Sequence, residues 1–277
     1  MVEGLLLACW GVLGYGGAKL VYPAVERLLR RIGSIQDNYR GRKIPVGAGL
    51  AVYLCGLAAG VLQWWFYPDE YVRHVLPWLL LGAGTATLAG WMDDQHGDPQ
   101  VKGLRGHFGV FFRQGVLTTG MLKAAILTAA AAIIGGVFSR NFWHWCLLTG
   151  TLVLSVNTFN LLDVRPGRSV KAFFFVFTMA AFFSPGFGAA AWMPYVGAVL
   201  AVSRFELQER CMLGDTGSNL LGMLFGLWLL AQQQLEQASA FFVLFVGLHV
   251  LAETSSISRA IERIRWLKRV DEWGRTH

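Results

Sequence analysis

The sequence predicts an all-α membrane protein, a polytopic bundle of about nine transmembrane helices. Its N-terminus is expected outside the membrane and its C-terminus in the cytoplasm. Three observations lead to this prediction. Of the 277 residues, 55% are hydrophobic and only 15% are charged, and the mean hydropathy is +0.46, which is too apolar for a soluble domain of this length. The apolar residues form runs of membrane length, and the basic residues gather between alternate runs.

The apolar runs define the expected helices in order, because about 20 apolar residues are needed to cross a bilayer. The first run follows Glu3 rather than basic residues and shows no small-residue cleavage pattern, so we interpret it as a retained span and not a signal peptide. The sixth and seventh runs are short and are joined by SPGFG at 184–188, so they could instead form a re-entrant hairpin. The predicted helices cover 4–22, 44–66, 76–92, 119–138, 143–162, 170–184, 188–203, 219–234 and 239–256.

The basic residues set the predicted orientation. A net charge of +7 could suggest a nucleic-acid partner, but 21 of the 24 Lys and Arg residues lie in five alternate segments between the runs. Cytoplasmic loops of membrane proteins carry such an excess of basic residues. We therefore expect no nucleic acid, and a multi-pass protein of the cell membrane. The segments placed in the cytoplasm are 23–43, 93–123, 163–171, 204–218 and 257–277.

Acidic residues cluster where the predicted helices end on the cytoplasmic side. The first cluster is GWMDDQHGD at 90–98, in which Asp93 and Asp94 are adjacent and Asp98 follows. Consecutive residues on a helix project about 100° apart, so the pair is expected to serve two roles. Carboxylates near a bilayer are costly and need a partner, for which a cation is the leading interpretation. The alternative is that these acids only cap a helix end.

The second cluster is NTFNLLD at 157–163. Its polar residues Asn157, Asn160 and Asp163 are spaced three apart, which lines two amides and a carboxylate along one stripe of the fifth predicted helix. Amides both donate and accept hydrogen bonds, as a sugar or a uracil ring requires. The alternative is that the two asparagines bridge neighbouring helices.

The third cluster, GDTGS at 214–218, sets Asp215 before the eighth predicted helix. Three acid-bearing helix ends on one membrane face could converge on a divalent ion, and oxygen ligands favour Mg²⁺, with Mn²⁺ as a second possibility. The basic segments 37–45 and 101–108 could supply counter-charge for a phosphorylated substrate, although headgroup contact also explains them. The four cysteines lie in or near apolar runs without CxxC spacing, so neither disulfides nor zinc are expected.

Four sequence elements occur in the order RKIPVGAG, GWMDD, NTFNLLD and GDTGS. In this order they resemble the polyprenyl-phosphate N-acetylhexosamine-1-phosphate transferase superfamily, which includes phospho-N-acetylmuramoyl-pentapeptide transferase. The resemblance covers about residues 14 to 260. Such enzymes transfer a sugar 1-phosphate from a UDP-sugar to undecaprenyl phosphate at the cytoplasmic membrane face and release UMP, in cell-envelope glycan synthesis. The resemblance also implies Mg²⁺ and a homodimer.

The resemblance assigns roles residue by residue. Asp93, Asp94 and Asp215 would be catalytic: Asp215 would bind Mg²⁺, and Asp93 and Asp94 would help to position the metal, with Asp94 as a second ligand, or would deprotonate the lipid phosphate. Asn160 and Asp163, with Asn157, would contact the nucleotide-sugar. Lys43 would be the early cation that contacts phosphate or nucleotide, a position that Arg40 or Arg42 could take in a shifted register. Lys102 is a further candidate for substrate binding.

The sequence departs from the family in two ways. Members usually have NLxDGxDGL where this chain has NLLDVRPGR, with Val164 and Pro166 in place of a glycine and an acid. A cytoplasmic His-rich motif is also missing. These departures favour the alternative of a non-catalytic relative that binds the lipid carrier or acts as a scaffold. An intramembrane prenyltransferase, with Asp94 and Asp98 as DxxxD, and a transporter are further alternatives, the latter disfavoured because no acid is expected at mid-membrane depth.

The expected domain organisation is simple. Residues 1–256 would form the transmembrane catalytic domain, and 257–277 a cytoplasmic basic amphipathic C-terminal helix. In that helix Ile257, Ile261 and Ile264 would form an apolar face, while Arg and Lys side chains meet anionic membrane lipid. The alternative is a solvated helix packed on the cytoplasmic loops.

Overall fold

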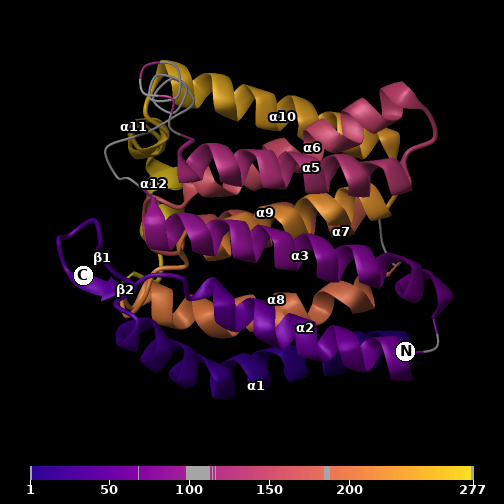
Figure 1. The fold of residues 1–277 in the computed structure, drawn as a ribbon, viewed down its shortest axis with the longest axis horizontal. Helices are drawn as coiled ribbons and strands as arrows, with labels where there is room; N and C mark the ends of the chain where they lie inside the picture. Colours follow the sequence, from indigo (N-terminus) through magenta and orange to yellow (C-terminus); the bar gives the residue numbers. More distant parts are fainter. Residues whose placement is uncertain are drawn as a thin grey trace.

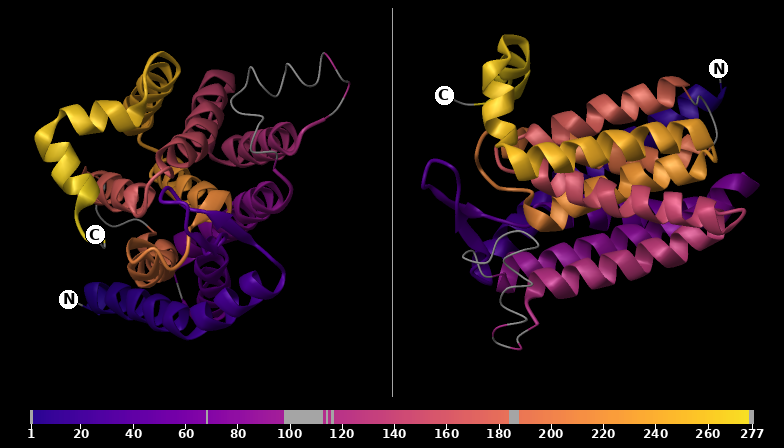
Figure 2. Two further views of the ribbon diagram at one scale, coloured as in Figure 1. Left: turned by 90° about the vertical axis from the view of Figure 1, so that its left-hand side faces the viewer. Right: turned by 90° about the horizontal axis from the view of Figure 1, so that it is seen from above.

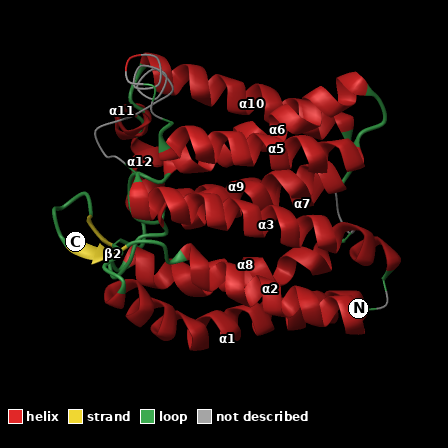
Figure 3. Cartoon of the chain, in the orientation of Figure 1, coloured by secondary structure: helices red, strands yellow, loops and turns green. Residues whose placement is uncertain are grey.

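The computed structural model describes residues 2–67, 69–97, 113, 115, 117–183 and 188–275. Within these ranges the chain is helical except for one short hairpin and the connecting turns (Figure 3). The elements are α1 (Val2–Arg31), β1 (Ile35–Asp37), β2 (Lys43–Pro45), α2 (Gly49–Phe66), α3 (Glu70–His96), α5 (Thr119–Phe138), α6 (Phe142–Leu162), α7 (Arg168–Phe183), α8 (Ala189–Leu207), α9 (Gly214–Ala231), α10 (Leu235–Thr254), α11 (Ile257–Arg263) and α12 (Arg265–Glu272).

The helices from α1 to α10 run side by side along the long axis of the molecule (Figure 1). They coincide with the apolar runs of the sequence, and the two chain ends lie at opposite ends of the bundle. The prediction of an all-α bundle is therefore confirmed. Six of the described helices, namely α1, α2, α3, α5, α6 and α10, are long and apolar enough to cross a membrane. Nine crossings and their direction remain a prediction, since α7, α8 and α9 are not among the six.

Helix α9 forms the centre of the bundle. Every residue from Thr216 to Ala231 is buried, and α3 and α6 pack on it most extensively, with α2 and α7 also in contact. Figure 2 shows α9 in the interior, while α1 and α10 lie at the outside. A helix that is apolar on all sides is stable only when it is enclosed. The position of Asp215 at the start of this helix is consequently determined by the packing of the whole bundle.

Close helix crossings depend on glycines in α9. A Cβ atom added at Gly222 would lie 2.4 Å from the Cα atom of Val156 in α6, and one added at Gly49 of α2 would lie 2.2 Å from the Cα atom of Gly217. The Ser155 hydroxyl donates a hydrogen bond of 2.8 Å to the Gly222 carbonyl oxygen at the first crossing. Small residues allow helix backbones to approach in this way, as in membrane helix pairs generally.

Backbone hydrogen bonds join the loops at one end of the bundle. The antiparallel strands β1 and β2 follow α1, and Met212, just before α9, donates its N–H to the Pro45 carbonyl oxygen over 2.8 Å. Ser34 donates to the Val46 carbonyl oxygen over 2.8 Å, and its hydroxyl accepts a 2.5 Å bond from the amide of Gln95 in α3. The starts of α2 and α9 and the end of α3 are thereby held together.

The C-terminal segment differs from the single helix expected there. It forms α11 and α12, because Ile264 between them adopts an extended backbone with φ −102° and ψ 107°. Arg168, at the start of α7, donates to both carboxylate oxygens of Asp271 over 2.8 and 2.9 Å. Arg275 donates to Asp271 over 2.8 Å and to the Pro166 carbonyl oxygen over 2.9 Å. The segment is thus clamped to the turn between α6 and α7.

Replacement of Gly222 by Ala should lower the stability of the bundle. The added methyl group would overlap the α6 backbone, and overpacking of this kind costs about 1–3 kcal/mol. The measurement is the midpoint of thermal unfolding in detergent, where we expect a decrease of several degrees. Gly247→Ala in α10 is the matched control, because nothing lies within 4 Å of a Cβ atom there. Equal midpoints for the two variants would contradict the close crossing.

Replacement of Asp271 by Asn should release the C-terminal segment. Burial would raise the pKa of Asp271, but the hydrogen bonds and charges of Arg168 and Arg275 outweigh it and hold the pKa below its usual value. The clamp is therefore present at neutral pH and is lost only as the pH falls through that lowered pKa. At pH 7, trypsin should cleave the segment of Asp271→Asn at least about tenfold faster than wild type. Glu272→Gln, which alters an exposed neighbour, should cleave at the wild-type rate.

Candidate active site

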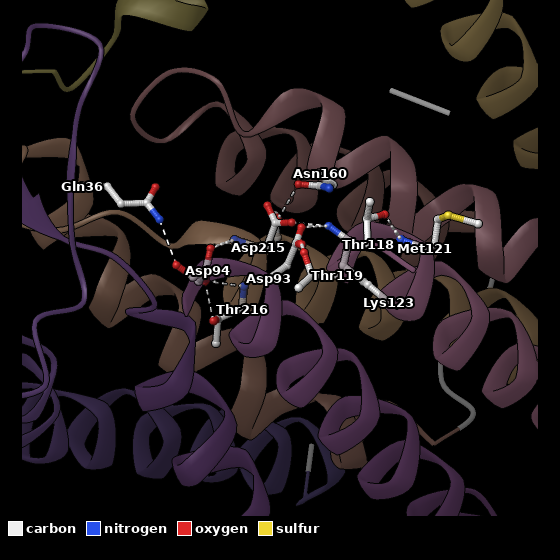
Figure 4. Close-up of polar contacts among 11 residues, drawn as sticks. Gln36, Asp93, Asp94, Thr118, Thr119, Met121, Lys123, Asn160, Asp215 and Thr216 are labelled. Atoms are coloured by element: carbon white, nitrogen blue, oxygen red, sulfur yellow. Dashed lines mark hydrogen bonds and ion pairs between the residues drawn. The ribbon is translucent and has the colours of Figure 1, made fainter. Parts of the chain in front are cut away.

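Two helix ends bring acidic side chains together at the hairpin end of the bundle, and a third helix places a lysine beside them (Figure 4). The C-terminal end of α3 carries Asp93 and Asp94, and the first turn of α9 carries Asp215. Lys123, near the start of α5, lies beside them. The two adjacent aspartates point to different partners, Asp93 to α5 and Asp94 to α9, as expected for consecutive residues on a helix.

Asp94 caps the N-terminus of α9 from another helix. One carboxylate oxygen accepts the Asp215 N–H over 2.9 Å; the other accepts the Thr216 N–H over 2.9 Å and the Thr216 hydroxyl over 2.5 Å. These N–H groups lie in the first turn of a helix, where no intrahelical acceptor exists and where the helix dipole favours an anion. Gly214 has φ +67°, and a Cβ atom there would lie 2.5 Å from Asp94. The glycine of GDTGS is required for this approach.

Lys123 lies between the other two aspartates. Its ammonium donates to Asp93 over 2.6 Å and also to Asp215, and Thr119 donates to the second oxygen of Asp93 over 2.8 Å. The three charged side chains are only 14–26% exposed, so the ion pairs are weakly screened. Lys123 was not predicted as a site residue. The available signal was a lysine near the start of an apolar helix, TGMLKAAIL, where an unpaired charge is expensive.

A cavity of about 380 Å³ opens beside this cluster. Asp94 and Asp215 form one wall, and the turn between α6 and α7 contributes Asp163 and Arg165. The last turn of α8 contributes Glu206. The remaining described lining residues are Gln36, Asp37, Asn38, Tyr39, Val46, Val164, Pro166, Cys211, Met212 and Gly214. The cavity therefore combines carboxylates from four separate helix ends or turns with residues of the hairpin.

A buried glutamate holds the hairpin at the cavity. Glu209, with a side chain only 1% exposed, accepts hydrogen bonds from Asn38 over 3.2 Å and from the Tyr39 hydroxyl over 2.9 Å. Its carboxylate also pairs with Arg40 and Arg42 at 3.3 and 3.7 Å. Burial and the hydrogen bond to Glu209 raise the pKa of Tyr39. These contacts attach guanidinium groups of the hairpin close to a cavity whose lining is mainly acidic.

The second predicted cluster divides between two roles. The Asn157 amide is hydrogen-bonded to His249 of α10 over 2.7 Å and is absent from the cavity lining, so this residue bridges two helices. Asn160 accepts a weak bond of 3.4 Å from Ser218 of α9 (Figure 4). Asp163 lines the cavity. Burial raises the pKa of Asp163 well above its usual value, and the negative charges of Glu206, Asp215 and Asp94 add to the effect.

Of the two lysines that were predicted to bind substrate, Lys43 and Lys102, the structure describes only Lys43. Lys43 lies on β2 with an exposed side chain and does not line the cavity. Arg165, which was not predicted, does line it and stacks on Tyr39, with 4.7 Å between the guanidinium carbon and the ring centroid. Lys102 and Asp98 lie outside the described residues. Among the described residues that line the cavity, the cation is therefore Arg165 of the NLLDVRPGR element.

The described acidic side chains of the site offer the oxygen ligands that Mg²⁺ prefers, but they are not arranged as a complete coordination shell. All the acidic groups are oxygen donors, as Mg²⁺ prefers. No group of three or more His, Cys, Asp or Glu side chains in the described part of the chain is arranged to hold a metal. Asp94 uses three of roughly four lone-pair positions in hydrogen bonds, which leaves Asp215 as the better ligand of the predicted pair. Mg²⁺ commonly takes one or two carboxylates and completes its shell with water and substrate phosphate.

Comparisons of the sequence with known proteins add no family assignment: no protein-family model matches the chain, and no curated protein matches it.

Replacement of Lys123 by Met should destabilise the protein, because Asp93 and Asp215 would face each other without a counter-charge. Breaking a buried ion pair costs 3–5 kcal/mol, and the partial exposure here lowers our expectation to about 2 kcal/mol. The measurement is thermal unfolding in detergent at pH 7. Lys19→Met, which removes an exposed lysine whose ammonium lies 5.4 Å from the Tyr15 ring centroid, is the control. An unchanged midpoint for Lys123→Met would mean that the two aspartates do not carry the expected charge.

Proposed function

We propose that the protein transfers a sugar 1-phosphate from a UDP-sugar to a polyprenyl phosphate such as undecaprenyl phosphate. The reaction would take place at the cytoplasmic face of the cell membrane and serve cell-envelope glycan synthesis. An oxygen of the lipid phosphate attacks the phosphorus attached to the sugar, the diphosphate bond breaks, and UMP leaves. The proposal includes nine crossings with the N-terminus outside, Mg²⁺ as cofactor and a homodimer.

The observation that carries the proposal is the meeting of Asp93, Asp94 and Asp215 beside one cavity at the end of a helical bundle. The residues come from two elements, GWMDD and GDTGS, that are 121 residues apart in sequence. Their position at helix ends supports a reaction between a soluble nucleotide and a lipid phosphate, because both can reach an interfacial site. Phosphoryl transfer depends mainly on placing anionic reactants in line and offsetting the charge that develops.

The described side chains have distinct parts in this reaction. Asp215 would hold Mg²⁺, which when bound would supply positive charge to offset the charge of the diphosphate. Lys123 has three N–H donors, of which two contact Asp93 and Asp215, so one remains for a phosphate oxygen. Asp93 is the group that can take a proton from the lipid phosphate once Lys123 turns toward the substrate. Asp94 keeps the N-terminus of α9 in place, and Arg165 pairs with the nucleotide phosphate at the cavity wall.

A second function, binding of the lipid carrier without catalysis, is favoured by one specific observation. All three aspartates already have partners within the protein: Lys123 neutralises Asp93 and Asp215, and the α9 N-terminus occupies Asp94. A binding protein needs no acid that is free to act on substrate. Turnover decides between the two functions.

Replacement of Asp215 by Asn should abolish turnover. Purified protein is incubated with undecaprenyl phosphate, Mg²⁺ and a panel of UDP-sugars, and UMP release is measured. Because the amide is a poor metal ligand, we expect the rate with the preferred donor to fall at least about 100-fold. Glu70→Gln, in the first turn of α3 at the opposite end of the bundle, should retain the wild-type rate.

The same assay with wild-type protein can reject the proposed transferase activity. Absence of UMP release with every donor, from protein that binds undecaprenyl phosphate and unfolds cooperatively, would reject the transferase and favour the binding protein. Chelation of divalent metal should stop turnover, and restoration by Mg²⁺ or Mn²⁺ would identify the metal that the enzyme uses.

A further inference from the structure

Besides Asp94 and Asp215, the lining of the cavity contains two carboxyl groups from a turn and a helix end described above. Asp163 directly follows α6, and Glu206 lies in the last turn of α8; both line the cavity. Asp163 and Glu206 come from two different elements and line the same cavity, and among the neighbouring acids the charge of Glu206 acts on Asp163 ahead of those of Asp215 and Asp94. Neither residue belongs to the set neutralised by Lys123.

One carboxylate oxygen of Glu206 is buried without a hydrogen-bond donor among the described residues. The residue is 3% exposed, and its Oε2 atom has no hydrogen-bond partner among the residues that the structure describes. The Glu206 carboxylate accepts a hydrogen bond from the backbone N–H of Gly167. Buried polar atoms are nearly always paired, and a buried carboxylate oxygen without a donor is expensive. Its place in the wall of a cavity indicates that the missing partner is a ligand.

Neighbouring cations do not fill this role. Lys171 and Arg275 are near enough for their charges to act on Glu206. However, Lys171 donates to the carbonyl oxygens of Val270 and Asp271 over 3.0 and 2.6 Å. Arg275 donates to Pro166 and Asp271. Both cations are directed to the C-terminal segment, and neither donates a hydrogen bond to the Oε2 atom of Glu206.

The charge of the whole lining leads to the same conclusion. The described lining residues include five carboxylates, Asp37, Asp94, Asp163, Glu206 and Asp215, and one cation, Arg165, for a formal charge of −5 + 1 = −4. A surface of one sign in a concave site concentrates counter-ions. One divalent ion at Asp215 leaves −2, which still repels a diphosphate, whereas a second divalent ion brings the lining to zero.

We propose that Asp163 and Glu206 bind a divalent cation, Mg²⁺ in the cell, at a site separate from that of Asp215. Two carboxylates supply two of its oxygen ligands, and water and phosphate oxygens of the substrate complete the shell, as is usual for Mg²⁺. The inference deepens the proposed function and rests on it for the role of the ion, which is to bind the nucleotide diphosphate. The binding of metal alone does not require turnover and can be tested separately.

The experiment counts Mn²⁺ ions on the full-length protein in detergent, freed of metal, with the EPR signal of free Mn²⁺ as the readout. Wild type should bind two ions, both displaced by excess Mg²⁺. Glu206→Gln should bind the second ion at least tenfold more weakly and retain the first, and Asp163→Asn should do the same. Asp215→Asn should lose the other ion. Glu236→Gln, a change of an acid in the first turn of α10, is the control and should bind two.

Two results would overturn the inference: one bound ion in wild type that only Asp215→Asn removes, or unchanged Mn²⁺ binding in both Glu206→Gln and Asp163→Asn. The use of two variants guards against misfolding of either, and thermal unfolding identifies a variant that does not fold. UMP release with a single bound ion would reject the second site alone. Two bound ions without UMP release from any donor would reject the transferase and leave the metal pair in place.

Discussion

The hydrogen bonds from the start of α9 to Asp94 are the constraint on which the rest of the site depends. They link the end of α3 to the beginning of the most buried helix in the bundle, and they satisfy backbone donors that would otherwise be unpaired near a bilayer. Asp215 is oriented by the same bonds, because its own N–H is one of the donors. Lys123 can bridge Asp93 and Asp215 only because α3 and α9 are held in this register. The carboxylate of Asp94 thus both caps α9 and fixes the relative positions of Asp93, Asp215 and Lys123.

The acids in this cavity are therefore of different kinds. Asp94 accepts hydrogen bonds from the start of α9, Asp215 shares Lys123 with Asp93 beside the cavity, and Glu206 has an oxygen without a hydrogen-bond partner among the described residues. Within the described chain, the positive charges in or near the cavity are those of Lys123, Arg165 and the guanidinium groups held by Glu209. Of these, Arg165 in the turn between α6 and α7 lines the cavity itself.

Much of this architecture is predictable from local sequence, for physical reasons. The apolar runs correspond to helices because length and hydropathy determine which segments can satisfy their backbone inside a bilayer. GDTGS and GWMDD could be recognised as helix ends for the same reason. The sequence could not predict that Asn157 would meet His249 or that Glu206 and Asp163 would line one cavity, because these arrangements depend on the rotation of one helix against another. Lys123 was not recognised because a lone lysine belongs to no motif. The extended backbone at Ile264 follows no turn-forming residue in the sequence, so the division into α11 and α12 was not predicted either.

The hydrogen bond from Arg275 to the Pro166 carbonyl oxygen connects the C-terminal segment to the cavity. Pro166 belongs to the same turn as Asp163 and Arg165, so one wall of the cavity is hydrogen-bonded to a tail that is 109 positions away along the chain. A displacement of that tail would therefore move the turn that carries two of the cavity-lining charges, although no described residue of the tail itself lines the cavity.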